Sequence, residues 1–224
     1  MNQYYTDTLS AGNLERCYEI APPRILQYFD AEIDFVANSL EPSDRVLEIG
    51  CGYGRVLPRL MKSASYVVGV DMSLGSLLYG RTMLPIQTTI QLAQMDAGTT
   101  AIQDGTFDIV VCIQNGISAF KVDPVILVGE SLRITNHGGK CLFSTYSDRI
   151  WEERLHWFQL QAEEKLLGDI DWNKTKRGTI VCKDGFVATT FSEDDFLRVA
   201  RELGVSCEMV EVDSSSLFCI FSAP

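Results

Sequence analysis

The sequence has little that would bind nucleic acid or enter a membrane. Lys and Arg total 19 against 30 Asp and Glu, which gives a formal net charge of −11. Proteins that neutralise phosphate backbones need clustered Lys and Arg, and no such cluster is present, so we expect no nucleic-acid partner. No apolar run approaches the roughly 20 residues that cross a bilayer, so we expect no membrane partner.

The sequence also lacks paired cysteines. Seven cysteines are present, but none of them form a C-x-x-C spacing. Several lie in apolar stretches, where a free thiol packs as a small hydrophobic group. Their number is odd and no secretory signal opens the chain, so we expect reduced thiols and a cytoplasmic location. We expect no metal site, and an arsenical substrate, which needs converging thiols, is disfavoured.

What the sequence does contain is an alternation of short apolar runs and helical patterns. The 224 residues are enough for one domain with a sizeable core. Alternation of this kind is typical of a parallel sheet covered by helices on both faces. The expected strands are 45–50, 66–71, 89–96, 107–113 and 140–146, the last introduced by the turn His137-Gly138-Gly139, and the expected helices are 24–40, a turn or two ending near 60, 73–84 and 124–135.

The C-terminal pattern predicts one reversed strand. A helical pattern over 192–205 precedes two apolar runs, 207–212 and 217–223. Only four residues separate these runs, which is too short for a parallel crossover, so the two strands must be antiparallel. We therefore predict an α/β fold with a doubly wound, mainly parallel, seven-stranded sheet whose last strand is antiparallel.

Residues 148–191 interrupt the alternation with a helical pattern and a hairpin. The helical face carries Trp151, Leu155, Phe158, Ala162 and Leu166, and Asp184-Gly185 is a hairpin turn signal. We predict that 148–191 is a lid over the substrate that excludes water, within one domain, 1–224, that begins with an N-terminal cap and helix, 1–43. Its aromatic residues, which include all three tryptophans, Trp151, Trp157 and Trp172, and Phe186, either shape an apolar pocket, attract a cationic substrate or form the lid's own core.

A glycine-rich turn follows the first expected strand, in VLEIGCGYGRVL. Gly50, Gly52 and Gly54 stand between a strand and a helix, where glycine lets the backbone approach a ligand. A dinucleotide-binding turn needs its third glycine at position 55, which is Arg55 here. A merely tight strand–helix turn is the structural alternative.

Three carboxylates accompany this turn. Asp71 ends the second strand, 21 residues after Gly50, where it can accept hydrogen bonds from two ribose hydroxyls or cap the next helix. Asp96 ends the third strand, where it suits an exocyclic amine or a hydroxyl, or serves as a turn residue. Glu48 lies in a strand expected to be buried, so it needs partners, either backbone groups or a cationic group of a ligand.

With the antiparallel last strand, these residues resemble the class I S-adenosylmethionine-dependent methyltransferases. VLEIGCGYG is similar to the first motif of that family, GVDMS to the second and QMDAGT to the third. FDIVVCIQNGISAF is similar to the fourth motif, and GGKCLFSTYS to the strand after it. The resemblance covers about residues 40–224, although the 148–191 insertion is not a general family feature. It implies a Rossmann-like fold and S-adenosyl-L-methionine as cofactor.

The resemblance also implies which residues contact the cofactor. The loop from Glu48 to Gly54 would contact the methionine moiety, the second motif the ribose, the third the adenine, and the fourth the methionine portion and the methyl group. The implied cofactor-binding residues are Glu48, Gly50, Cys51, Gly52, Gly54, Asp71, Met72, Asp96, Ala97, Ile113, Gln114 and Asn115. The segment Ile113-Gln114-Asn115 is similar to C-x-G-N segments of small-molecule amine methyltransferases.

Candidate catalytic residues follow from the expected sheet. Methyl transfer is an in-line displacement that needs the nucleophile aligned at about 3 Å and, for an N–H or O–H group, a proton acceptor. Ligands of open α/β sheets bind beyond the carboxyl ends of the strands. Tyr146 and Asp148 follow the fifth strand, and His156 lies on the inserted helix, so these three are candidate bases. His137 precedes that strand, at the wrong edge, and orientation alone suffices for a neutral amine.

We therefore predict an enzyme, an S-adenosylmethionine-dependent methyltransferase that acts on a small-molecule N or O nucleophile by in-line displacement. IQNGIS, after the fourth strand, has neither the proline nor the adjacent aromatic residue of segments that methylate nucleobases. A non-catalytic cofactor-binding module and a nicotinamide-dependent oxidoreductase are the alternatives. Tyr4, Tyr5, Tyr18 and Arg24 are expected either to cover the cofactor or to pack as ordinary residues; the sequence determines neither the methyl acceptor nor the oligomeric state.

Overall fold

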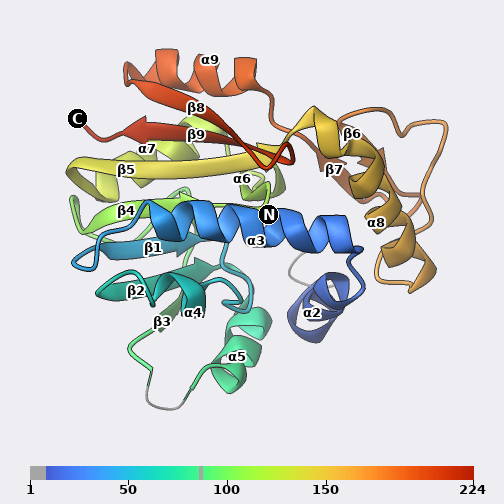
Figure 1. Cartoon of the computed structure of the whole chain (residues 1–224), viewed down its shortest axis with the longest axis horizontal. Coiled ribbons are helices and arrows are strands. Elements are labelled where there is room, and N and C mark those ends of the chain that lie inside the picture. The colour runs from blue at the N-terminus through green and yellow to red at the C-terminus, as the bar shows by residue number, and fades with distance from the viewer. Residues whose placement is uncertain (1–8, 86–87) are drawn as a thin grey trace.

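The computed structural model describes residues 9–85 and 88–224, and a twisted seven-stranded sheet forms its centre (Figure 1). The strand order is β3-β2-β1-β4-β5-β9-β8. The strands are β1 (Arg45–Ile49), β2 (Tyr66–Asp71), β3 (Gln91–Gln94), β4 (Phe107–Cys112), β5 (Thr135–Tyr146), β8 (Cys207–Val212) and β9 (Ser216–Ser222). Strands β1 to β5 are parallel, and β9 runs antiparallel to both β5 and β8. The predicted Rossmann-like sheet with a reversed last strand is confirmed.

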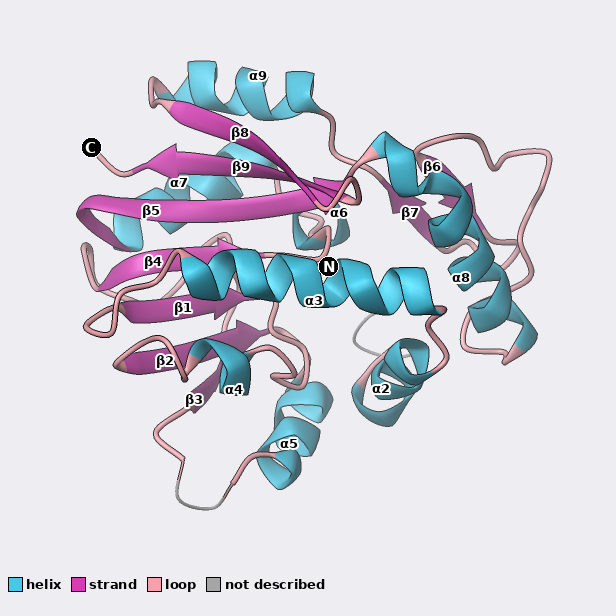
Figure 2. Ribbon diagram, in the orientation of Figure 1, coloured by secondary structure: helices cyan, strands magenta, loops and turns pink. Residues whose placement is uncertain are grey.

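Helices cover both faces of the sheet (Figure 2). One face packs against α7 (Pro124–Ile134) and α9 (Glu193–Leu203), and the other packs against α3 (Pro23–Asn38), α4 (Leu57–Leu60) and α5 (Leu74–Met83). On β1, Leu47 and Ile49 belong to the first core, and Val46 belongs to the second. Alternate residues of one strand thus fill two cores, as expected for a strand buried on both sides.

The predicted helix ends have local causes. In α9 the Ser192 and Asp195 side chains form a capping box, and the helix ends at Gly204 with φ of 66°. In α3 a proline, Pro23, occupies the first turn, where no backbone donor is lost. In α5 the Ser73 hydroxyl accepts a hydrogen bond from the Ser76 amide.

Three local predictions were wrong or incomplete. The expected turn His137-Gly138-Gly139 lies inside β5, which begins at Thr135, because the pairing with β4 shifts register between Phe107 and Ile109. Helix α2 (Ala11–Glu19) lies in a segment where we predicted no helix. It buries only Cys17 among its own residues. Helix α6 (Gly116–Ala119) was also not predicted and is a single turn.

The predicted helix–hairpin insertion is present beyond the end of β5. It comprises a 3-10 turn, η1 (Asp148–Ile150), helix α8 (Trp151–Glu163) and the antiparallel strands β6 (Thr179–Val181) and β7 (Val187–Thr189). Trp157, Phe158 and Phe186 form one buried cluster with Phe29 of α3 and residues of α2. Trp172 does not join the other two tryptophans in this cluster, since 58% of it is exposed.

Candidate active site

The glycine turn brings backbone donors and a carboxylate together at the carboxyl end of the parallel strands. The Gly50 and Cys51 amides donate to the Val70 carbonyl at 2.8 and 3.0 Å, and the Gly52 amide donates to Asp71 Oδ2 at 2.9 Å. Gly50 has φ of +73°, and a Cβ there would lie 2.8 Å from Cζ of Phe120. Both its conformation and its surroundings therefore require glycine.

Asp71 links the turn to the next helix while facing a cavity. Its Oδ1 accepts from the Ser73 amide at 2.7 Å, and its Oδ2 accepts from Gly52. Burial raises the pKa of this carboxyl, and the backbone hydrogen bonds from Ser73, Gly52 and Met72 oppose that shift. Each carboxylate oxygen can accept more than one hydrogen bond, so a ligand's hydroxyls can still bind here.

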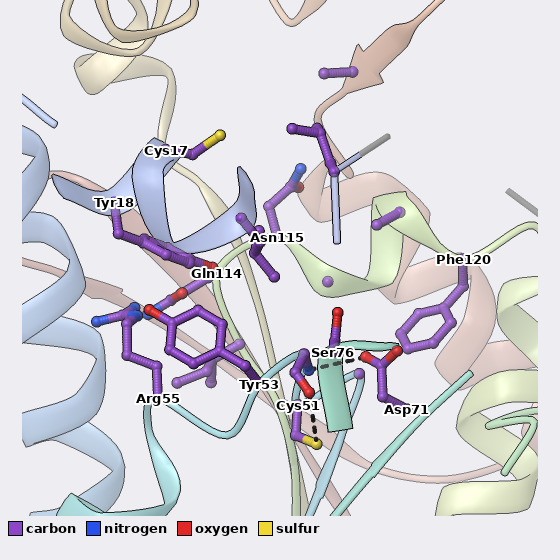
Figure 3. Close-up of a pocket in the computed structure, with 18 of the residues that line it drawn as sticks. Cys17, Tyr18, Cys51, Tyr53, Arg55, Asp71, Ser76, Gln114, Asn115 and Phe120 are labelled. Atoms are coloured by element: carbon purple, nitrogen blue, oxygen red, sulfur yellow. Dashed lines mark hydrogen bonds between the residues drawn. The ribbon is translucent and has the colours of Figure 1, made fainter. Parts of the chain in front are cut away.

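A cavity of about 330 Å³ opens at this edge of the sheet, the place where α/β folds bind ligands. Of the twelve residues implied as cofactor contacts, all except Gly54 and Ala97 line it. Gly54 instead closes the turn, its amide donating to the Cys51 carbonyl, and Ala97 is buried in the core. Figure 3 shows Arg55 and Tyr18 on one side of this cavity and Asp71 and Phe120 on the other.

Two ionisable groups of opposite sign line the cavity, the buried Glu48 and the half-buried Arg55. Glu48 is 5% exposed and its Oε2 has no hydrogen-bond partner among the described residues. Burial raises the pKa of Glu48 to about 8, although the nearby Arg55 lowers it. Arg55 stands over the ring of Tyr18 at 4.1 Å, and its buried Nε and Nη2 likewise find no acceptor in the described chain. Buried polar atoms left without partners in this way are costly unless a ligand completes their hydrogen bonds.

The segment after β4 is held in an unusual conformation by side chains from elsewhere. Gln114 and Asn115 have φ of 58° and 60°, in the left-handed region. The Gln114 amide donates to Oε2 of Glu32 at 2.6 Å, and the Asn115 Oδ1 accepts from Thr145 Oγ1 at 2.9 Å. Glu32 is fully buried, and burial raises its pKa to about 7. Sequence reasoning missed Glu32, since it lies on α3, far from any motif.

Helix α8 and the hairpin form the far wall of the cavity. Arg154, Trp157, Phe158 and Gln161 lie at successive turns of one face of α8, and Phe186 faces them from the hairpin. The Asn115 Nδ2 donates to the Thr189 carbonyl of β7 at 2.9 Å, which ties the segment after β4 to this wall. The i, i+3, i+4 and i+7 spacing was visible in the sequence, but the charged Arg154 and the polar Gln161 hid its buried face.

The structure separates the three candidate bases. Tyr146 lines the cavity and is 7% exposed. Asp148 and His156 are exposed and do not line it; the Asp148 carbonyl accepts a hydrogen bond from Arg177. His156 lies on the outer face of α8, because the inner face is occupied by Arg154 and the aromatic residues.

The N-terminal segment covers the glycine turn through α2. A Cβ on Gly52 would lie 2.9 Å from Cδ2 of Leu14. The Trp157 indole donates to the Cys17 carbonyl at 2.8 Å, which joins α2 to α8. Of the four N-terminal candidates, Tyr18 lines the cavity, Arg24 pairs with Asp213 on the surface, and Tyr4 and Tyr5 lie outside the described residues.

Comparison with known proteins agrees with this geometry. Residues 47–143, from β1 through most of β5, match the family model of the methyltransferase domain. The sheet core of the chain is therefore similar to methyltransferase domains. The matched segment contains the glycine turn, Asp71, Asp96 and the segment after β4, and α2, α8 and the hairpin lie outside it.

The chain is similar to named methyltransferases at low identity. The chain is 27% identical over 137 residues to 2-methyl-6-phytyl-1,4-hydroquinone methyltransferase of Synechocystis, covering 57% of this chain and 42% of that protein. It is 24% identical over 200 residues to ubiquinone biosynthesis O-methyltransferase of Colwellia psychrerythraea, covering 86% and 72%. A SAM dependent methyltransferase from Aquifex aeolicus superposes with a TM-score of 0.65 at 14% identity, covering 94% and 98%. At this identity the superposition shows the fold alone.

Residues 9–85 and 88–224 contain no group of three or more His, Cys, Asp or Glu side chains placed to hold a metal ion. Within those ranges, no helix has the length and apolar character needed to traverse a bilayer. All seven cysteines are free thiols, and burial raises the pKa of the Cys17 thiol to about 12.

Proposed function

We propose that this protein is an S-adenosylmethionine-dependent methyltransferase that acts on a small-molecule N or O nucleophile by in-line methyl displacement. The observation that carries the proposal is the pair of ionisable side chains with unpartnered buried atoms, Glu48 and Arg55, in the same cavity as Asp71. A ligand with an amino-acid end and a ribose satisfies all three groups at once. S-adenosylmethionine is such a ligand.

The residues present fit this cofactor from end to end. Arg55 has two free donor atoms for the α-carboxylate, and Glu48 has a free oxygen for the α-ammonium group. Asp71 offers lone pairs to the two ribose hydroxyls. Asp96, at the rim of the cavity, faces the region where the adenine amine would lie. When bound, the sulfonium supplies the methyl group.

A dinucleotide fits the same cavity poorly. A pyrophosphate carries two negative charges and binds where backbone amides converge without nearby acids. Here the glycine turn is flanked by Glu48 and Asp71, and the Gly52 amide is already used by Asp71. The nicotinamide-dependent alternative therefore conflicts with both the charge and the donor set of the turn.

The chain's own residues position the acceptor and exclude water. Asn115 holds the segment after β4 against β7. The end of the cavity for the methyl donor and the end for the methyl acceptor therefore share a wall. Helices α2 and α8 close over the glycine turn and bury Trp157 and Phe158. Tyr146 is the one of the three candidate proton acceptors that lines the cavity. This enclosure is the role we assign to residues 148–191 as a lid.

A small-molecule acceptor suits an enclosed cavity in an acidic protein. The two relatives named above act, by their names, on a phytyl hydroquinone and in ubiquinone biosynthesis, so their acceptors are small molecules too. The formal charge of −11 opposes binding of nucleic acid. Seven free thiols support a reducing compartment, and we place the protein in the cytoplasm.

Calorimetry with three ligands tests the proposal. Purified protein is titrated with S-adenosylmethionine, S-adenosylhomocysteine and NAD under one set of conditions. We expect micromolar binding of the two sulfur compounds and no heat with NAD. Saturable binding of NAD alone would overturn the proposal, and cofactor binding without turnover of any amine, phenol or carboxylate acceptor would favour the non-catalytic module.

A further inference from the structure

The end of the cavity that is lined by α8 and the hairpin is here called the lid end. We propose that the lid end binds a flat, apolar acceptor whose nucleophile is an oxyanion, and that Arg154 is the residue that binds this oxygen. The inference rests on the proposed function, since it concerns the acceptor side of the same cavity. It narrows the N or O nucleophile to an oxygen acid, either a phenol or a carboxylate.

Arg154 is a buried cation that lies close to Asn115, in the segment after β4. It is 1% exposed, lines the cavity and donates through Nη2 to the Thr189 carbonyl at 3.2 Å. The Asn115 side chain donates to that same carbonyl oxygen at 2.9 Å. The guanidinium and Asn115 therefore meet at one atom. The family resemblance implies that the segment containing Asn115 borders the methyl group, and on that assignment Arg154 stands next to the point of transfer.

The aromatic residues around Arg154 are already in contact with cations of the protein. The Arg154 guanidinium lies over the ring of Tyr146 at 4.3 Å and within 5.6 Å of the ring centre of Phe158. Arg55 lies over Tyr18 at 4.1 Å. The Tyr146 and Tyr18 ring faces are thus already occupied by cations of the protein, and Arg154 would repel a second positive charge nearby. This disfavours an ammonium-bearing acceptor.

The remaining surface of the lid end suits a planar, apolar body. Phe158 and Phe186 lie with ring centres 6.1 Å apart and planes at 29°. Trp157 and Ala188 complete this apolar wall. Gln161 lies two turns along α8 from Arg154, and its buried Nε2 finds no acceptor among the described residues. A second oxygen on the acceptor would satisfy this amide.

An oxyanion needs no base at the moment of transfer. The acceptor loses its proton to solvent before it is enclosed in the cavity. A lone pair of its oxygen then forms the O–C bond as the C–S bond breaks. That bonding pair goes to sulfur, which becomes a neutral thioether, and the negative charge of the acceptor is cancelled. Arg154 favours the ionised acceptor in a buried site where an unpaired oxyanion would be costly. This accounts for the absence of His156 and Asp148 from the cavity.

A chromophoric phenol provides the test. 4-Nitrophenol, whose anion absorbs visible light, is titrated against pH while bound to the complex of the protein with S-adenosylhomocysteine. We expect the bound phenol to ionise at least one pH unit lower than the free phenol. Its own spectrum is measured because Glu32 and Glu48, with pKa values near 7 and 8, titrate in the same range, and Asp71, Arg55 and Tyr146 also line the site.

Variants and a matched amine decide the outcome. Arg154→Gln should weaken binding of 4-nitrophenol and benzoate about 10- to 100-fold and abolish the shift in ionisation, with S-adenosylhomocysteine affinity changed less than twofold. Arg154→Lys should keep part of the oxyanion affinity and part of the shift in ionisation. Arg198→Gln, on the solvent-facing side of α9, should change neither. Benzylamine should bind weakly to all four proteins.

The inference fails separately from the proposed function. It is overturned if S-adenosylhomocysteine binds but neither 4-nitrophenol nor benzoate binds at millimolar concentration. Tighter binding of benzylamine, or oxyanion binding unaffected in Arg154→Gln, would also overturn it. Failure of S-adenosylhomocysteine itself to bind the wild-type protein would instead remove the proposed function. Retained cofactor affinity in Arg154→Gln shows that this variant is folded.

Discussion

The two ends of the cavity are built in different ways. At the sheet edge, the wall is formed by the backbone of the glycine turn and by side chains within a few residues of a strand end, such as Glu48 and Asp71. At the lid end, the wall is formed by side chains that come from α2, β5, α8 and β7, segments far apart in the sequence. Local sequence therefore specifies the first end, and tertiary packing specifies the second.

The two ends also differ in charge. Glu48, Asp71 and Asp96 line the sheet edge together with the cation Arg55, whereas Arg154 lines the lid end among aromatic rings. A sulfonium cofactor with an ammonium group suits the acidic end, and an anionic acceptor suits the basic one. In our proposal, charge alone therefore directs the methyl donor and the methyl acceptor to opposite ends of one cavity.

The largest expected effect comes from filling the space beneath the glycine turn. Gly80 of α5 packs so closely that an added Cβ would lie 2.2 Å from the Tyr53 carbonyl oxygen. We expect Gly80→Ala to displace the turn, lower the free energy of unfolding by about 1–3 kcal/mol and abolish measurable binding of S-adenosylhomocysteine. Denaturant unfolding and calorimetry measure the two effects.

Gly75→Ala, in the same helix, is the matched control. Its added Cβ would meet nothing closer than the Ser73 hydroxyl at 4.0 Å. We expect unchanged cofactor affinity and a stability equal to or above that of the wild type, since alanine favours helix by up to about 1 kcal/mol. Equal loss in both variants would show that the turn does not depend on close packing by α5.

Removing the carboxylate that follows β2 should have the next largest effect. We expect Asp71→Ala to weaken S-adenosylhomocysteine binding by roughly 1.5–3 kcal/mol, because charge-assisted hydrogen bonds to the ribose and to the Gly52 amide are lost. Asp44→Ala, at the opposite edge of the sheet, where Asp44 caps a turn, should leave the affinity unchanged. An unchanged affinity in Asp71→Ala would place the ribose elsewhere.

The buried carboxyl of Glu48 should make the sheet-edge end sensitive to pH. Burial raises its pKa from 4.5 to about 8, so the folded protein binds a proton that the unfolded chain releases between those values. Stability of the ligand-free protein should therefore fall as pH rises from about 4.5 to 8, and affinity for the cofactor's ammonium group should rise.

Glu48→Gln isolates this contribution. We expect the variant to bind S-adenosylhomocysteine weakly and with little dependence on pH between 6 and 8.5, measured by calorimetry in buffers of matched ionic strength. Burial raises the pKa of Glu32 to about 7. Because Glu32 is present in both proteins, it makes the same contribution to the pH dependence of stability in each. A pH dependence of affinity that survives in Glu48→Gln would assign it to another group.

The smallest effects should come from the two candidate bases that face solvent. We expect His156→Ala and Asp148→Asn to change turnover and KM less than twofold, because neither side chain lines the cavity. A tenfold loss in either variant would mean that the lid end rearranges when ligands bind, since only a movement of α8 or η1 could bring these side chains inward. Steady-state kinetics with any accepted substrate decide between the two outcomes.

Much of the sheet-edge end could be predicted from sequence. Alternating apolar runs placed the strands, and the four-residue link after 207–212 required the reversed last strand. The glycine turn and Asp71 were recognisable because backbone conformation and strand ends are decided within a few residues. His156 was a poor candidate because its position on a helix was predictable but the rotation of that helix was not.

What the sequence determined by itself is the α/β order of elements, the backbone path of the glycine turn and the carboxylates that follow the strands. Only the tertiary structure decided that Glu32 holds the Gln114 amide, that α2 covers the turn and that Arg154 and Asn115 donate to the same Thr189 carbonyl. The physical reason is the range of the interactions. Turns and caps are fixed by neighbours in the chain, whereas a buried charge is placed by packing between helices and strands that only the folded chain brings together.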